Sequence, residues 1–227
     1  MIFGISVTYT RENVEVVSSE EFIRRYIDAR AHFGWYFMFM PVGKDPILDL
    51  VPTPEQRLAF GRRIAEVRNR LPIFLADFWN DGPAVGGCLA GGRLYLHILN
   101  SGKVEPCVFA HFGVDNIREK TILEAANSPF FRSIRKRFPY NQSGNLMRPC
   151  MIIDNPQVLR EAVAENVAVQ GHEHSEDIIR NPSVVEWIDR YAQRFQELTD
   201  PEWERLINDP KGRWHREGPE YRSLFKR

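Results

Sequence analysis

The three cysteines of this sequence, Cys88, Cys107 and Cys150, are the residues with the most distinctive chemistry. They stand in three separate segments, and the first two share the spacing C-x13-G-x4-C around Gly102. An odd number of cysteines at low density argues against a disulfide framework, so reduced thiols are expected. Three thiolates from separate segments suit a soft metal centre, either an iron–sulfur cluster or zinc. The alternative is that they are buried and act only as small apolar residues.

The backbone around these cysteines is shaped by glycine and proline. A hairpin that turns at Asn100-Ser101-Gly102 sets Cys107 roughly opposite Tyr95. The glycine-rich segment 86–92 must then curl back to bring Cys88 near Cys107, and glycine permits such a curl. Proline precedes both Cys107 and Cys150, and its fixed φ angle is a plausible way to hold a thiolate at a preset angle.

The elements that precede the first cysteine alternate between strand and helix. We predict three strands, Ile2–Thr8, Trp35–Val42 and Pro72–Trp79, joined by helices that begin at Ser18 and Thr53. The apolar run Trp35–Val42 favours a strand covered on both faces. Short connections and alternating elements indicate parallel strands with right-handed crossovers.

Three strands are too few to close a barrel. Such a sheet leaves two open edges and part of an apolar face uncovered, so the rest of the chain, a second copy or another protein must complete it.

A different unit begins after Asn80-Asp81-Gly82, with glycine-rich turns, the hairpin and two short helices near 121–127 and 128–137. Helices are then predicted over Pro156–Asn166 and Pro182–Leu198, and the last 28 residues show no clear pattern. We therefore predict an α/β fold, α+β overall, with three strand–helix units of a partial barrel followed by a small domain of a hairpin and helices. The predicted domains are residues 1–82, 83–155 and 156–227.

The charge composition excludes several classes of partner. Thirty Lys and Arg balance thirty Asp and Glu, which argues against binding to nucleic acid or to an anionic membrane surface. The longest apolar run, Trp35–Val42, is far shorter than a bilayer span, and the N-terminus lacks the features of a signal peptide. A cytoplasmic location is the expectation.

The cysteine region resembles the auxiliary cluster domain of radical SAM enzymes, of the SPASM or twitch type. The spacing between Cys88 and Cys107 agrees with the opening motif of that family, and the later pieces follow in the same order. The resemblance is carried by the segments 86–88, 93–98, 102–107, 116–120, 128–131 and 148–150. It implies one auxiliary iron–sulfur cluster, of the 4Fe–4S type, with Cys88, Cys107 and Cys150 as its ligands.

Residues 1–87 are similar to the last three strand–helix units of the radical SAM partial barrel. Those enzymes cleave S-adenosylmethionine at a cluster held by a C-x3-C-x2-C motif, and no two cysteines here stand so close. The chain therefore looks like the C-terminal half of such an enzyme. The resemblance implies that a separate N-terminal half, or self-association through the open sheet edges, completes it.

The resemblance also implies which residues contact the cofactor. Ser6 on the first strand, with Pro41, Val42 and Gly43 after the second, match positions that bind S-adenosylmethionine, which is expected only if the missing half is supplied. No catalytic residue is assigned.

In the family, an auxiliary cluster conducts electrons or anchors substrate in a radical reaction. The fourth iron ligand is unassigned: His111 is one candidate, although a hydrogen-bonded histidine at the hairpin end explains it more simply. The alternative function is a non-enzymatic zinc or iron–sulfur module for structure or electron transfer.

Overall fold

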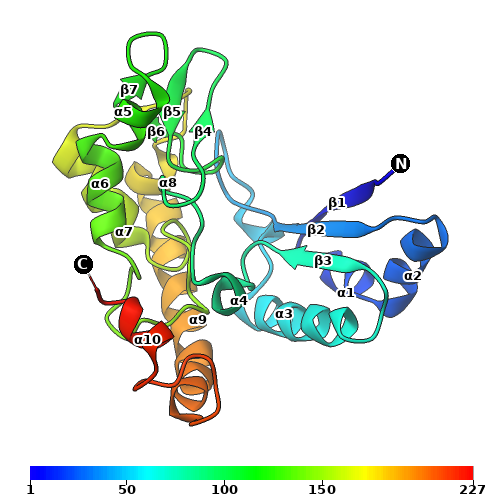
Figure 1. The fold of residues 1–227 in the computed structure, drawn as a ribbon. Coiled ribbons are helices and arrows are strands. Elements are labelled where there is room, and N and C mark those ends of the chain that lie inside the picture. Colours follow the sequence, from blue (N-terminus) through cyan, green and yellow to red (C-terminus); the bar gives the residue numbers. More distant parts are fainter. Residues whose placement is uncertain (227) are drawn as a thin grey trace.

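The computed structural model describes residues 1–226 and has two arms that meet at a steep angle (Figure 1). One arm is a parallel sheet with helices on one side. The other contains the small antiparallel strands and the long C-terminal helix. The mixed α/β fold predicted from the sequence is confirmed.

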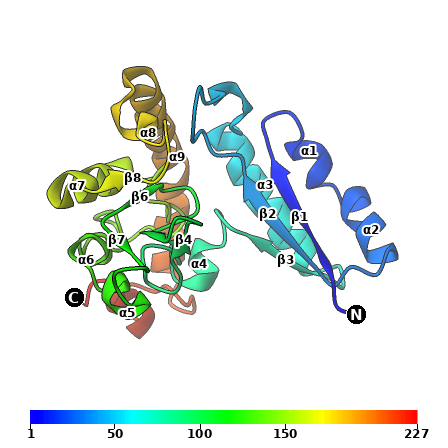
Figure 2. The ribbon, with the colours of Figure 1, turned by 90° about the horizontal axis from the view of Figure 1, so that it is seen from above.

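The first arm is built on three parallel strands in the order β1 (Gly4–Tyr9), β2 (Phe33–Met38) and β3 (Phe74–Asp77). Ser6 lies beside Trp35, and Trp35 beside Ala76. The predicted parallel order is confirmed. The carboxyl ends of all three strands face the second arm, whereas the N-terminus lies at the far end (Figures 1 and 2).

Three helices cover one face of this sheet, α1 (Val14–Val17), α2 (Glu20–Asp28) and α3 (Pro54–Arg68). A short 3-10 helix, η1 (Leu48–Leu50), precedes α3. The core between sheet and helices is aromatic: the rings of Tyr9 and Phe60 stack at 4.0 Å, and Tyr36 meets Phe60 edge-on at 5.2 Å. Burial of such rings is the main favourable contribution to this arm.

The two predicted helix starts have different outcomes. Thr53 forms a complete capping box with Gln56, as the sequence indicates. Ser18 does not cap α2. Its neighbour Ser19 does, by accepting a hydrogen bond from the amide of Phe22 at 3.2 Å, because Ser18 already ends the unpredicted helix α1.

No part of residues 1–226 covers the opposite face of the sheet. The prediction that the second strand is buried on both faces is therefore wrong. The side chains of Trp35 and Phe74 are 43% and 63% exposed, while their alternating neighbours Tyr36 and Leu75 are buried. Trp35, Phe37 and Phe78 pack against one another on this uncovered face.

The second arm begins at the short helix α4 (Gly82–Val85) and continues into small sheets. Strands β4 (His97–Ile98), β5 (Lys103–Glu105) and β7 (Asp115–Asn116) pair antiparallel, which confirms the hairpin. Strand β6 (Phe112–Gly113) pairs with β8 (Val169–Gln170). The helices α5 (Ile122–Ala126) and α6 (Pro129–Lys136) follow, capped by Thr121 and Ser128.

The C-terminal region consists of α7 (Pro156–Asn166), α8 (Asp177–Arg180), α9 (Pro182–Asn208) and α10 (Pro219–Ser223). Helix α9 does not end near Leu198 as predicted but continues through Pro201. The burial of Trp203 and Ile207 beyond the proline in a small second core outweighs the missing backbone hydrogen bond. No helix within residues 1–226 has the length and apolarity needed to span a bilayer.

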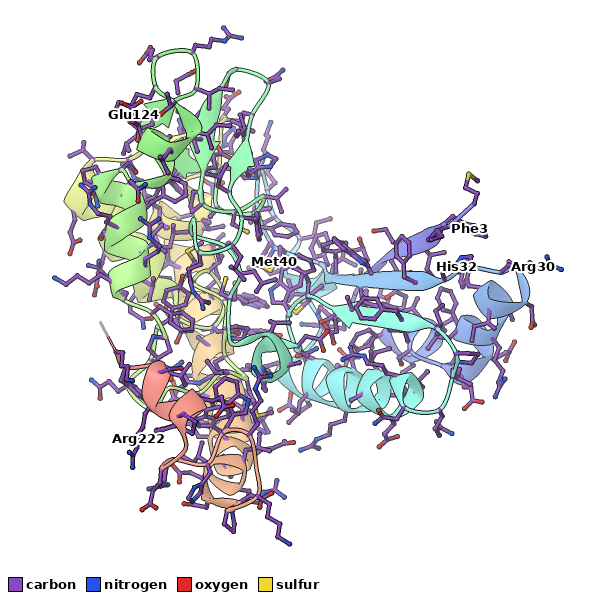
Figure 3. The ribbon with its side chains drawn as sticks, in the orientation of Figure 1. Phe3, Arg30, His32, Met40, Glu124 and Arg222 are labelled. Atoms are coloured by element: carbon purple, nitrogen blue, oxygen red, sulfur yellow. The ribbon has the colours of Figure 1, made fainter. Side chains whose placement is uncertain are left out.

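A fully buried ion pair joins the two arms. Arg57 on α3 donates to both carboxylate oxygens of Asp154, which lies just before α7. The same guanidinium donates to the carbonyl of Trp79 at 3.2 Å and lies over the ring of Phe195 on α9, at 3.9 Å from its centroid. Figure 3 shows the junction near Met40, with Phe3 and His32 at the far end of the sheet.

Replacement of Asp154 by asparagine is expected to lower the free energy of unfolding by about 3–5 kcal/mol, because it leaves the buried Arg57 charge without its counterion. Urea unfolding of the purified protein measures this. The control is Glu202→Gln, which removes the exposed partner of Arg62 and is expected to cost less than ~1 kcal/mol. Equal stability of the two variants would contradict this account of the junction.

Candidate metal centre

The three cysteines come from three different elements of the second arm. Cys88 lies in the glycine-rich loop after α4, Cys107 follows β5, and Cys150 lies in the turn before α7. All three are free thiols, partly buried and packed against the main core.

The loop that carries Cys88 curls back as the sequence predicts. Gly86, Gly87, Gly91 and Gly92 all have positive φ angles, which glycine adopts without strain. The amide of Gly91 donates to the carbonyl of Pro106 at 2.8 Å, and this hydrogen bond fixes the loop beside Cys107.

Arg93 holds the same loop from the side. Its guanidinium donates to the carbonyl of Cys88 and to that of Gly86, the latter at 3.3 Å. It also lies over the ring of Phe138, at 3.6 Å from the ring centroid. A positive charge therefore stands next to the first cysteine.

The hairpin sets Cys107 opposite Tyr95, as expected. The hydroxyl of Tyr95 and the sulfur of Cys107 are 3.2 Å apart, within hydrogen-bonding distance. This contact is a direct consequence of the antiparallel register in which His97 lies beside Glu105.

The turn that carries Cys150 is held by two buried side chains that follow it. Asp154 Oδ2 accepts a hydrogen bond from the amide of Cys150 at 2.9 Å. Asn155 donates to the carbonyls of Arg148 and Cys150, at 2.8 and 3.2 Å. Because Asp154 also binds Arg57, the third cysteine is fixed to the sheet arm.

Burial and neighbouring charges raise the pKa values of the three thiols. Burial, and then the nearby Cys107 thiolate, raises the pKa of Cys88 to about 12. Burial, Asp154 and Cys88 raise the pKa of Cys150, and burial also raises that of Cys107. Burial, and then the charges of the three cysteines, raise the pKa values of Tyr95 and Tyr140.

Backbone amides two or three residues after each cysteine favour its thiolate and partly oppose the effect of burial on its pKa. These amides belong to Ala90 for Cys88, to Phe109 and Ala110 for Cys107, and to Ile152 and Ile153 for Cys150. The Ile152 amide lies 3.4 Å from the Cys150 sulfur. Amide donors of this kind stabilise thiolates and tune the potential of iron–sulfur clusters.

The donor set fits an iron–sulfur cluster better than a single ion. Within residues 1–226, no three His, Cys, Asp or Glu side chains lie close enough to share one metal ion. A cluster spreads its irons, so its thiolate ligands stand further apart than the ligands of one zinc ion. Three soft sulfurs that pack against the same core and do not share one ion are consistent with that requirement.

The other residues of interest have different surroundings. His111 Nδ1 lies 2.9 Å from Glu105 Oε2, and its ring packs against that of His172. Hydrogen bonding at the hairpin end, the simpler explanation, accounts for His111. Asp77 is buried at the end of β3, where burial raises its pKa to about 6, and Asp81 pairs with Arg68.

The residues predicted to contact S-adenosylmethionine lie on the sheet arm, at two different positions along the strand direction. Ser6 is exposed within β1, level with Trp35. Pro41, Val42 and Gly43 come after β2 has ended at Met38, so the register sets them further along the sheet than Ser6. Gly43 has a φ of +92°, a conformation that favours glycine.

Sequence reasoning did not identify Arg57, Asp154 or Tyr140. A signal existed for Arg57, which interrupts the otherwise apolar buried stripe of α3 at helical spacing from Phe60 and Ile64. Asp154 stands four residues after Cys150, but nothing local indicates that its partner lies in α3.

Comparison with known families gives one match, and it covers the cysteine region. Residues 88–151 match the family model of SPASM, described as an iron–sulfur cluster-binding domain. The match begins at Cys88 and includes all three cysteines. No curated protein and no solved structure matches the chain. The likeness of residues 1–87 to the radical SAM barrel therefore stays a prediction.

In the metal-free protein, Cys88 is expected to react with iodoacetamide about a thousandfold more slowly at pH 8 than an ordinary cysteine, because burial favours its neutral thiol. The raised pKa stabilises the fold below pH 9, and this contribution is lost as the pH rises from 9 towards 12. Mass spectrometry of peptides alkylated across this range measures the rate. The control is the same protein in urea. Equally fast alkylation of folded and unfolded Cys88 would refute the prediction.

Proposed function

We propose that this protein binds one iron–sulfur cluster, of the 4Fe–4S type, through Cys88, Cys107 and Cys150. The cluster transfers electrons or anchors a substrate in a radical reaction. The protein is then the C-terminal portion of a radical SAM-like oxidoreductase. One observation supports the proposal above all: residues 88–151, which match an iron–sulfur cluster-binding domain, carry three free thiols on three segments of the same arm.

The position of the cysteines relative to the sheet supports a role in catalysis over a purely structural one. Ligands of parallel sheets bind at the carboxyl ends of the strands, and these ends face the arm that carries the cysteines. Trp79, just beyond β3, packs at 5.2 Å against Phe109, two residues after Cys107. A substrate at this end of the sheet would therefore lie near the cluster.

We further propose that a second polypeptide covers the open face of the sheet. The exposed aromatic side chains and the unpaired edge of β1 support this, because soluble proteins rarely leave both uncovered. A separate N-terminal radical SAM-like half would supply the cluster that cleaves S-adenosylmethionine, and Ser6, Pro41, Val42 and Gly43 would then contact that cofactor. Self-association through the same edge is the other arrangement.

Anaerobic reconstitution with iron and sulfide tests the cluster. The wild type is expected to become brown and to hold about four irons and four sulfides per chain. Cys107→Ser is expected to lose most of the bound iron and the visible absorbance, because it removes one of three thiolates.

The matched control is Val108→Ser, which introduces the same side chain at the exposed neighbouring position and is expected to keep the cluster. Stoichiometric zinc in place of iron and sulfide would favour the alternative, a non-enzymatic zinc module. An unchanged spectrum in Cys107→Ser would remove Cys107 from the ligand set.

Sedimentation velocity tests the open face. The wild type is expected to associate with itself, or with a co-expressed N-terminal half, and Trp35→Asp is expected to weaken this association at least tenfold by burying an unpaired charge in the contact. Val16→Asp is the control, since Val16 is an exposed apolar residue on α1, on the helical side of the sheet. Equal weakening by both variants, or none by Trp35→Asp, would count against the open face as the interface.

A further inference from the structure

Tyr140 has a buried hydroxyl group without a hydrogen-bond partner among the described residues. The residue is 4% exposed, and its oxygen is the only tyrosine oxygen in residues 1–226 that is both buried and unpaired. A buried polar group without a partner is costly and rare in native proteins. The buried hydroxyl of Tyr140 therefore indicates a hydrogen-bond partner that is not part of the polypeptide.

The other buried tyrosines show what is ordinary in this protein. Tyr36 donates to the carbonyl of Val17 at 2.8 Å, and Tyr191 lies 3.7 Å from the sulfur of Met38. Tyr95, on the other side of the cysteines, already has the Cys107 sulfur as its partner. Tyr140 alone faces the cysteine region with its hydroxyl unused.

The surroundings of the hydroxyl place it beside the loops that carry Cys88 and Cys107. A side chain at Gly91 would begin 3.3 Å from the Tyr140 oxygen, so the hydroxyl occupies space that this glycine leaves free. Gly91 is three residues after Cys88, and its amide is bonded to Pro106, the residue before Cys107. The hydroxyl therefore lies where the loops of the first two cysteines meet.

The backbone holds Tyr140 in this place. Its φ angle is +76°, in the left-handed region that residues other than glycine seldom adopt. Its amide donates to the carbonyl of Arg137 at 2.8 Å, and its ring packs edge-on against Phe138 at 5.5 Å. An unfavourable backbone conformation is retained where the surrounding structure determines it, often at functional sites.

We propose that the Tyr140 hydroxyl donates a hydrogen bond to a sulfur of the bound cluster, either an inorganic sulfide or a cysteine thiolate. This inference rests on the proposed function and makes Tyr140 a positioning residue that tunes the cluster. Reduction adds one electron to the cluster and makes its sulfurs more negative, so a donor stabilises the reduced state more than the oxidised state. Tyr140 thereby raises the reduction potential, and no covalent bond forms or breaks.

The test compares Tyr140→Phe with the wild type after anaerobic reconstitution. Bound iron and sulfide are expected to be retained, since no ligand is removed. At a fixed solution potential the ratio of reduced to oxidised cluster is expected to fall about tenfold, which corresponds to a shift of about 59 mV for a one-electron couple. A redox titration followed by electron paramagnetic resonance measures the ratio.

Tyr36→Phe is the matched control, because it removes the hydroxyl of an equally buried tyrosine whose partner is a backbone carbonyl. It is expected to leave the potential unchanged and to lower the melting temperature of the metal-free protein. Tyr140→Phe is expected to leave that melting temperature unchanged or raised, because it removes an unpaired buried hydroxyl.

Different outcomes would overturn the cluster and the Tyr140 hydrogen bond. An unchanged potential in Tyr140→Phe with full iron and sulfide would overturn the role of Tyr140 and leave the cluster intact. A wild type that takes up neither iron nor sulfide would overturn both. A Tyr140→Phe protein that melts well below the wild type without metal would show that the hydroxyl has a partner within the protein, and would also overturn the inference.

Discussion

The ion pair between Arg57 and Asp154 is the interaction on which the arrangement of this protein depends. Neither side chain is accessible to solvent, so the guanidinium must find all its partners inside the protein. It does so on three elements: the carboxylate before α7, the carbonyl of Trp79 after β3, and the ring of Phe195 on α9. Moving either arm would leave a buried charge unpaired.

The same pair links the sheet to the cysteines. Asp154 uses one oxygen to accept from Arg57 and from the amide of Cys150. The orientation of the Cys150 turn is thus set by a residue of α3, an element of the sheet arm. An arrangement in which the cysteines formed an independent module would not need this connection. Through this link, the proposed centre in one arm would be held at a defined position relative to the strand ends of the other arm.

The parts predicted from the sequence are those determined by neighbouring residues. The Thr53 capping box and the contact of Tyr95 with Cys107 follow from local spacing, because a cap and a hairpin register involve residues close along the chain. Arg57 and Asp154 are 97 residues apart, and no local pattern pairs them.

Two further predictions failed because a distant contact decided the outcome. The continuation of α9 through Pro201 depends on the burial of Trp203 in a separate small core. Whether the apolar strand β2 has one covered face or two depends on what packs against it, which its own residues do not reveal. The space that the Tyr140 hydroxyl occupies likewise depends on a glycine 49 positions earlier in the sequence, Gly91.

The electrostatics of the cysteine region balance two opposing requirements. Burial raises the pKa of each thiol, so the metal-free site prefers three neutral thiols, and ligand binding must release their protons. The amides ahead of each cysteine and the guanidinium of Arg93 favour the charged form instead. By themselves these groups do not offset the effect of burial on the pKa values. The thiols of the metal-free protein therefore stay protonated. In the cluster-bound protein that we propose, the same groups would lie next to the ligands of the cluster. These polar groups would therefore stabilise the metal-bound state that we propose.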